Sequence, residues 1–220
     1  LNKGKEEKDK FKGIYGVELE MSEDTLDVVI NPTNKTLLDS TYVVFDTETT
    51  GFNAGLNDSM IEIGAVKIEH GVILESFDEL IDPGCPIDSS ITKLTGISDE
   101  MVKGKDDEKT VVKKFKEWIG DLPLVAHNAK FDISMLKMAY YKYGFGELKN
   151  TVLDTLVISQ LINKGLKRHN LTALAKNYGI KFEENDNEDD DVSSNNSSHH
   201  HRADYDAENT GYIFYKMLKQ

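Results

Sequence analysis

Two acidic residues, Asp46 and Glu48, follow an apolar run that ends at Phe45. Residues two apart on a strand point to the same face, so these carboxylates are expected side by side where a buried strand ends. Paired acids repel each other and lose hydration unless a cation compensates, and carboxylate oxygens suit Mg²⁺ or Mn²⁺. The pair therefore indicates a divalent metal site. The alternative is that both acids cap a turn with Thr49 and Thr50, because acids are common turn formers.

A further acid, Asp132, lies near the start of a predicted helix. Asn128 is a suitable N-cap residue, and the helix dipole favours a carboxylate in the first turn. Asp132 could therefore simply stabilise the helix start. Helical spacing, however, places it on the same face as the apolar residues between Met135 and Tyr143, so it is expected to point inward. An inward acid needs a partner, and a metal ion would serve.

The third group lies at the start of the last predicted helix, at 207–218. Asp204 is suited to the N-cap and Asp206 to the first turn, while His201 lies on the loop before them. Histidine accepts protons near neutral pH, so His201 is a candidate general base, whereas the two histidines before it are expected to be solvated. Four acids and one histidine suit two-metal phosphoryl chemistry, in which one ion activates water and the other steadies the leaving oxygen.

The elements that must position these residues are predicted from hydrophobic periodicity. Three successive strands suggest a meander, with a tight turn at His70 and Gly71. Strands that then alternate with helices predict an α/β fold with a mixed β-sheet flanked by helices. The predicted strands are 42–45, 60–68, 72–81 and 122–126, and the predicted helices are 110–119, 131–143, 156–162, 171–178 and 207–218.

The charge balance excludes a strongly basic nucleic-acid binder as a class. The 220 residues hold 26 Lys and Arg against 39 Asp and Glu, for a net charge of −13, and a 39% hydrophobic content is sufficient for a core. Seven of the acids lie in 183–191. When these and the four candidate ligands are set aside, 28 acids face 26 bases, so the acidity is local and is compatible with a nucleic-acid substrate.

Other features concern the setting and organisation of the chain. Cys85 is the single cysteine, no apolar run approaches a membrane span, and a cytoplasmic location is expected. The composition of 183–198 predicts a disordered acidic loop. Alternating residues at 15–21 predict a strand without a partner, so 1–40 is expected to be a separate flanking element. The start at Leu1 suggests a piece of a longer protein.

Five motifs in this order resemble those of the DnaQ-like, DEDDh-type 3′–5′ exonucleases. The resemblance covers nearly all of 41–220 and implies an RNase H-like fold, two Mg²⁺ or Mn²⁺ ions and release of nucleoside monophosphates from a 3′ end. The motifs are Phe-Asp-Thr-Glu-Thr-Thr-Gly (45–51), Ile-Glu-Ile-Gly-Ala-Val (61–66), Leu-Thr-Gly-Ile-Ser (94–98), His-Asn-Ala-Lys-Phe-Asp (127–132) and His-Arg-Ala-Asp-Tyr-Asp-Ala-Glu (201–208).

The resemblance also implies a role for each matching residue. His201 would be the general base, and Asp154 would be structural support instead of a ligand. The implied metal ligands are Asp46, Glu48, Asp132 and Asp206, and the implied contacts to the terminal nucleotide are Thr49, Thr50 and Asn128.

Within this family the chain is similar to the proofreading domain inserted in PolC-type bacterial replicative polymerases. That similarity implies a single-stranded DNA 3′ end as substrate, the rest of a polymerase polypeptide as partner, and no membrane. Residues 13–40 resemble the stretch of the polymerase PHP domain that precedes the insertion, which predicts a flank at 1–40 and an exonuclease domain at 41–220. The alternatives are a free-standing exonuclease acting on short RNA or repair intermediates, and an inactive interaction module.

Overall fold

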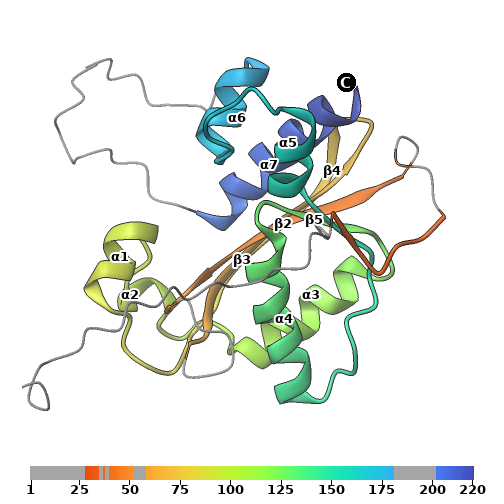
Figure 1. The fold of residues 1–220 in the computed structure, drawn as a ribbon. Coiled ribbons are helices and arrows are strands. Elements are labelled where there is room, and N and C mark those ends of the chain that lie inside the picture. The colour runs from red at the N-terminus through yellow and green to blue at the C-terminus, as the bar shows by residue number, and fades with distance from the viewer. Residues whose placement is uncertain (1–27, 35–36, 38–39, 52–57, 181–201) are drawn as a thin grey trace, which may run out of the picture.

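The computed structural model describes residues 28–34, 37, 40–51, 58–180 and 202–220. The strand expected at 15–21, the acidic segment at 183–198 and His201 lie outside these residues. The described residues form one six-stranded mixed sheet with helices on both faces (Figure 1), which confirms the expected α/β fold. The strand order across the sheet is β1-β6-β5-β2-β3-β4.

Three long strands form the expected antiparallel meander. They are β2 (Tyr42–Thr49), β3 (Met60–Glu69) and β4 (Val72–Leu80). The first four residues of β2 are all buried, because both faces of the sheet are covered there. His70 and Gly71 join β3 to β4 with φ angles of 51° and 83°, the positive values that a tight hairpin turn requires.

Three short strands complete the sheet on the other side of β2. β5 (Leu124–Ala126) is parallel to β2, β6 (Val152–Asp154) is parallel to β5, and β1 (Val29–Ile30) is antiparallel to β6. Sequence patterning did not indicate β6 or β1, because two or three residues are too few to show a period.

Seven helices surround the sheet in the described part of the chain (Figure 1). The five longer ones match the predicted helices to within a few residues at each end. They are α1 (Ser89–Thr95), α2 (Asp99–Val102), α3 (Glu108–Ile119), α4 (Ala129–Tyr143), α5 (Thr155–Ile162), α6 (Leu171–Tyr178) and α7 (Ala203–Leu218).

The start of α7 differs from the sequence prediction. The helix begins at Ala203 and not at residue 207, so Arg202 occupies the N-cap position that was assigned to Asp204. Asp204 and Asp206 both lie in the first turn, where the helix dipole favours a negative charge. The prediction was wrong because the contact that fixes this helix end comes from Glu62, a residue of the distant strand β3.

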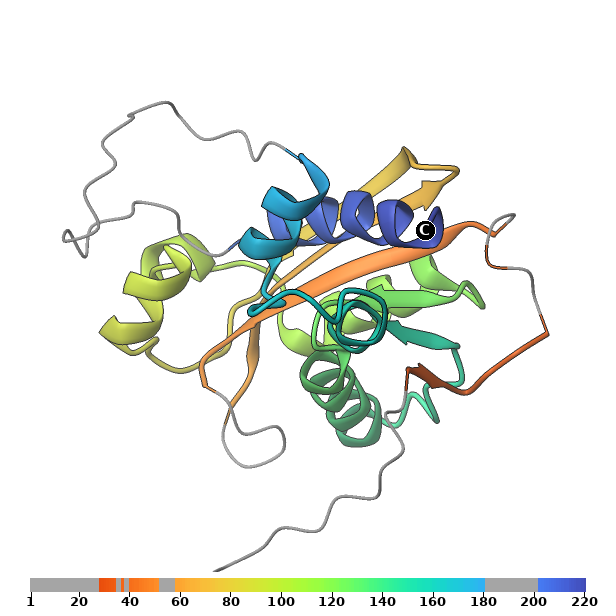
Figure 2. The same cartoon turned by 45° about the horizontal axis from the view of Figure 1, so that its top comes forward.

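The two faces of the sheet carry separate apolar cores. Val43 and Phe45 point to the face covered by α3 and α4, whereas Tyr42 and Val44 point to the face covered by α7. Figure 2 shows α7 lying along the sheet, with α6 on the same side and α4 on the other. Ile158 of α5 packs into the core on the α7 side. The alternation that separates the two cores also decides on which face each acid of β2 lies.

Residues from the predicted flanking segment attach to this sheet. The side-chain amide of Asn31 donates hydrogen bonds to the carbonyl oxygens of Asn150 at 3.1 Å and Leu148 at 3.4 Å. Thr151 Oγ1 donates in return to the carbonyl oxygen of Asn31 at 2.7 Å. With the pairing of β1 and β6, these bonds connect the described end of the flank to the region around β6.

Candidate active site

Three carboxylates meet at the end of β2. Asp46 and Glu48 share the α7 face of the strand, and Asp206 reaches them from the first turn of α7. One carboxylate oxygen from each of the three residues lies within 4.8 Å of the others, and all three residues are partly buried. The structure therefore brings together three of the four acids that the sequence predicts as ligands.

The electrostatics of this group are unfavourable without a cation. Burial raises the pKa of Asp46 well above its ordinary value, and the charges of Asp132, Glu48 and Asp206 raise it further. Hard divalent ions prefer carboxylate oxygens, and a bound cation would lower the cost of ionising these groups together. The donor chemistry and spacing of the three acids thus fit Mg²⁺ or Mn²⁺.

Asp132 lies beside this group and is held by a different strand residue. Its side chain is buried, and Oδ1 accepts hydrogen bonds from the backbone N of Thr47 at 3.0 Å and from Thr47 Oγ1 at 2.7 Å. Burial raises the pKa of Asp132 to about 7, although the bonds from Thr47 lower it. The inward orientation expected from helical spacing is confirmed, and the charge of Asp132 acts on Asp46.

A buried acid of β3 holds the start of α7, and sequence patterning did not single it out. Glu62 is fully buried and lies directly opposite Glu48 in the β2–β3 ladder. Its Oε1 accepts hydrogen bonds from the guanidinium of Arg202, with Nε at 2.8 Å, and its Oε2 accepts one from the backbone N of Ala203 at 2.9 Å. These bonds position the helix turn that carries Asp206.

Gly64 allows the same helix end to approach the sheet. It pairs with Asp46 across the ladder, and a Cβ at this position would lie 2.0 Å from the backbone N of Asp204. Backbone cannot yield to such a contact, so the position requires glycine. The run 60–66 looked apolar and strand-like; the charged Glu62 and the side-chain-free Gly64 within it were the signals that could have identified this contact.

Two of the three predicted nucleotide-contact residues, Thr49 and Thr50, make local hydrogen bonds. Thr49 Oγ1 donates to the carbonyl oxygen of Gly51 at 2.6 Å, and Thr50 Oγ1 accepts from the backbone N of Ser59 at 3.0 Å. Asn128 precedes α4 as expected, but its side chain makes no capping hydrogen bond and its φ is 63°.

Asp154 shapes the adjacent turn. Its Oδ1 accepts hydrogen bonds from the backbone N of Asn128 at 3.1 Å and of Leu156 at 2.9 Å. One carboxylate thus joins the start of α4 to the start of α5. This contact is the structural support that the sequence predicted for Asp154.

His127 is a half-buried neighbour of the carboxylate group, and the sequence assigned no role to it. Its Nδ1 lies 3.0 Å from Thr155 Oγ1. Burial lowers the pKa of His127 to about 4, opposed by the charge of Asp206. His127 is therefore neutral at pH 7, and its contact with Thr155 connects the start of α4 to the start of α5.

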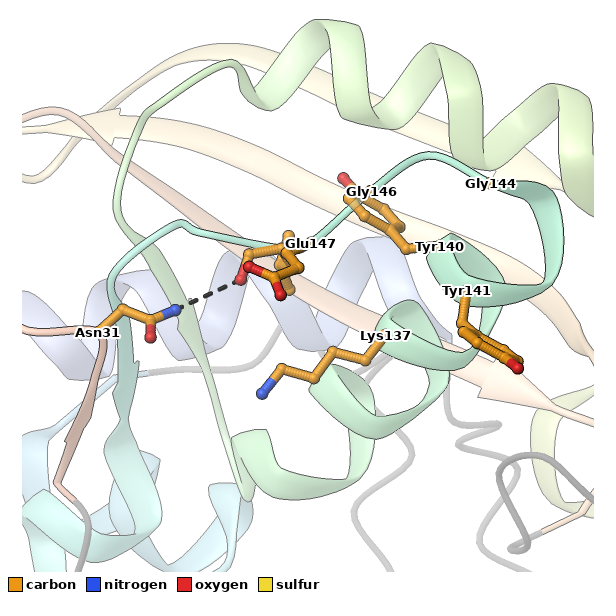
Figure 3. Close-up of a pocket in the computed structure, with 8 residues that line it drawn as sticks. Asn31, Lys137, Tyr140, Tyr141, Gly144, Gly146 and Glu147 are labelled. Carbon is orange, nitrogen blue, oxygen red and sulfur yellow. Dashed lines mark hydrogen bonds between the residues drawn. The ribbon is translucent and has the colours of Figure 1, made fainter.

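A separate pocket of about 660 Å³ lies away from the carboxylates (Figure 3). It is formed by the C-terminal part of α4, the loop after it and Asn31, whose amide points toward the carbonyl oxygen of Leu148. None of the candidate ligands lines it. The pocket therefore belongs to the junction between the flank and the sheet.

A mixed sheet that ends in paired acids, faced by a further acid at a helix start on each side, is an arrangement of carboxylates that fits the metal ions of phosphodiester-cleaving enzymes. The family model for exonucleases, RNase_T, matches residues 43–214. The chain belongs to this exonuclease family, and the resemblance drawn from its five motifs is confirmed.

Curated relatives include polymerases that are much longer than this chain. The DNA polymerase III PolC-type proteins of Listeria monocytogenes and Halalkalibacterium halodurans are each 40% identical to it, over 95% and 98% of the chain. The matched regions span 13% and 14% of those polymerases. The chain thus contains an exonuclease domain similar to a small part of each polymerase.

Solved structures show the same fold at low sequence identity. Exonuclease X in complex with 5′ overhanging duplex DNA matches with a TM-score of 0.60 and 23% identity, over 81% of this chain and 91% of that one. A 3′-exonuclease that recognises a histone mRNA stem-loop matches with a TM-score of 0.67 and 15% identity, over 84% and 67%. In the described part of this chain no helix is long and apolar enough to cross a membrane.

Proposed function

We propose that this exonuclease domain is a divalent-metal-dependent 3′–5′ exonuclease that removes nucleoside monophosphates from single-stranded DNA ends, as the proofreading part of a replicative polymerase. The observation that carries the proposal is the convergence of Asp46, Glu48 and Asp206 within 4.8 Å, beside buried Asp132. The 40% identity to PolC-type polymerases supports the assignment to proofreading.

The proposal assigns three roles to these residues: metal binding, positioning of the ligands and proton transfer. Asp46, Glu48, Asp132 and Asp206 would hold two Mg²⁺ or Mn²⁺ ions, which activate water and stabilise the leaving oxygen when bound. Thr47 fixes the orientation of Asp132, and Glu62 with Arg202 fixes the turn that carries Asp206. His201, next to Arg202 in the sequence, would accept the proton of the attacking water.

The test compares single-stranded DNA and RNA of equal length, with Mn²⁺ and with a chelator. We expect stepwise release of monophosphates from the 3′ end of DNA, abolished by the chelator. Preference for RNA would favour the free-standing alternative, and no activity together with no Mn²⁺ binding in calorimetry would favour the inactive interaction module.

A pair of variants separates the base from the ligands. His201→Ala is expected to lower the rate by about 10² to 10⁴ while Mn²⁺ binding remains, because a positioned general base contributes about that factor. Asp46→Ala is expected to lose both activity and Mn²⁺ binding. His199→Ala, two residues before His201, is the matched control and should keep full activity. Full activity of the His201→Ala protein would contradict the assignment of the base.

A further inference from the structure

The chain from α5 to the end of α6 is basic in an otherwise acidic protein. Between residues 155 and 180 there is no Asp or Glu, although the protein carries a net charge of −13. Four cationic side chains lie in this stretch and all four are exposed: Lys164, Lys167, Arg168 and Lys176. The first three lie in the loop between α5 and α6, which we call the α5–α6 loop (residues 163–170).

This loop is anchored at the edge of the carboxylate site through His169. The Nδ1 atom of His169 lies 2.8 Å from Oγ of Ser159 in α5, and the first residue of α5, Thr155, contacts Nδ1 of His127 through its Oγ1 at 3.0 Å. His127 in turn is close enough to Asp206 for the charge of that carboxylate to act on its pKa. Lys167 and Arg168 therefore directly precede a residue that is fixed to α5, the helix whose first residue contacts His127.

The two views of the fold agree with this placement. Figures 1 and 2 both show α6 beside α7, and Leu174 and Ala175 of α6 pack against Ile213 and Met217 of that helix. Helix α7 covers the face of the sheet to which Asp46 and Glu48 belong. The α5–α6 loop therefore lies on the same side of the molecule as the carboxylates, whereas α3 and α4 cover the other side.

The positive charges of this loop have no ion-pair partner in the part of the chain that the structure describes. Among the described residues, no carboxylate lies within ion-pair distance of Lys164, Lys167 or Arg168. Other lysines of the protein do have such partners, such as Lys114 with Asp106 at 2.8 Å and Lys142 with Glu108 at 2.9 Å. An unpaired guanidinium can hold a phosphate through two parallel hydrogen bonds.

We propose that Lys164, Lys167 and Arg168 bind the phosphate backbone of the nucleic-acid strand whose 3′ end occupies the carboxylate site. This inference rests on the proposed function and adds the path of the strand beyond its terminal nucleotide. An acidic site in a protein of net negative charge repels a polyanion, so a local basic surface next to it is needed to hold the strand.

The test uses two substrates, of which only one is long enough to extend from the carboxylate site to the α5–α6 loop. The p-nitrophenyl ester of thymidine 5′-monophosphate occupies the carboxylate site alone, whereas a long single-stranded DNA also extends past it. The double variant Lys167→Ala/Arg168→Ala is compared with Lys105→Ala/Lys109→Ala, which removes the same charge from exposed positions at and before the start of α3. KM is measured for both substrates with Mn²⁺ at several salt concentrations.

We expect the loop variant to raise the KM for long DNA about 10- to 30-fold at 0.1 M salt relative to its KM for the ester, because each phosphate contact to a single strand contributes a salt slope of about 0.7. Its slope of log KM against log salt should fall by about 1.4, while the control pair should leave both quantities close to wild type. Equal effects of the two double variants, or no effect of either, would overturn this inference.

Two further outcomes distinguish phosphate binding by the loop from an inactive carboxylate site and from polypeptide binding. If wild-type protein hydrolyses neither substrate, the proposed function fails, which is a different result from an unchanged KM in the loop variant. Polyglutamate is added as a competitor: if the loop variant resists inhibition by polyglutamate but binds DNA normally, the loop binds acidic polypeptide instead and the inference is overturned.

Discussion

Glu62 of β3 and Arg202, the residue before α7, form an ion pair that joins the sheet to the helix carrying Asp206. Glu62 is completely buried, and its second oxygen also accepts a hydrogen bond from the backbone N of Ala203. One carboxylate thus caps the helix and pairs with a guanidinium. Because Glu62 lies opposite Glu48 in the ladder, the same pair also compensates a negative charge next to the candidate metal site.

Glu62→Gln is expected to destabilise the protein by about 3 kcal/mol, because breaking one partner of a buried pair leaves the other uncompensated. It should also weaken Mn²⁺ binding, since Asp206 loses the support of its helix turn. Urea unfolding and calorimetry measure the two effects. The control is Glu75→Gln, which breaks the exposed pair of Lys67 with Glu75 and should cost under about 1 kcal/mol. Equal losses in the two variants would show that the Glu62 pair has no special role.

Mn²⁺ is expected to stabilise wild-type protein, by about 2.7 kcal/mol at a free concentration one hundred times its Kd. Asp46→Asn should abolish most of this gain. In chelator the same variant should melt at a higher temperature than wild type at neutral pH, because the folded-state pKa of Asp46 is raised by burial and by neighbouring acids. Thermal melting with and without Mn²⁺ measures both effects, and an equal Mn²⁺ response in the two proteins would argue against Asp46 as a ligand.

Asp78 of β4 gives the stability a pH dependence. Burial, followed by the charges of Glu62 and Asp204, raises its pKa from 3.8 to about 6, although Arg202 opposes the shift. A carboxyl whose folded pKa is raised loses stability as pH rises from about 4 to about 6. The free energy of unfolding of the Asp78→Asn variant should therefore rise relative to that of wild type between pH about 4 and about 6. The gain should be on the order of 1 kcal/mol above pH 6, because the Asp78 carboxyl is only partly desolvated and solvent screens the shift.

Unfolding of both proteins between pH 3.5 and pH 8 tests the Asp78 prediction. The two stability curves should run in parallel at the acid end, where the carboxyl is protonated in both folded and unfolded chains. A difference that is the same at every pH would show that the substitution acts through packing and not through titration.

Substitution of tyrosine by phenylalanine is expected to have opposite effects on stability at Tyr140 and at Tyr42. The hydroxyl of Tyr140 is buried and has no hydrogen-bond partner among the described residues, whereas that of Tyr42 donates to the carbonyl oxygen of Leu37 at 2.6 Å. Tyr140→Phe removes an unsatisfied polar atom and should stabilise the protein by about 1 kcal/mol, while Tyr42→Phe should cost about 1 kcal/mol. Urea midpoints of the two variants measure the contrast; a loss at Tyr140 would mean that its hydroxyl is bound by water or a ligand.

Local spacing was sufficient to predict much of the candidate site. The two-residue period of a strand placed Asp46 and Glu48 together, and the helical period turned Asp132 inward. Whether those residues perform the chemistry stays a prediction, as does the role of His201. The long periodic strands and helices were also predicted, because hydrophobic periodicity is a strong signal over eight or more residues.

The features of the fold that could not be predicted from the sequence depend on contacts between distant residues. The early start of α7 depends on Glu62 and on the missing side chain of Gly64, both far from Arg202 in the sequence. The hydrophobic pattern near residue 207, from which the helix start was predicted, contains no signal of these two residues. β1 is held by hydrogen bonds to β6, and β6 by hydrogen bonds to β1 and β5, which a single segment cannot reveal.

Because β1 pairs with β6, the domain boundary that the sequence resemblance predicts, between residues 40 and 41, separates one strand from the rest of the sheet. The flank predicted at 1–40 provides Val29 and Ile30, the outermost strand on that side. A recombinant protein that starts at Thr41 would leave the backbone amides and carbonyls of β6 exposed at an open edge, where strands of other molecules can add. Such a protein is expected to self-associate and precipitate, so the soluble, crystallisable unit should begin before Val28.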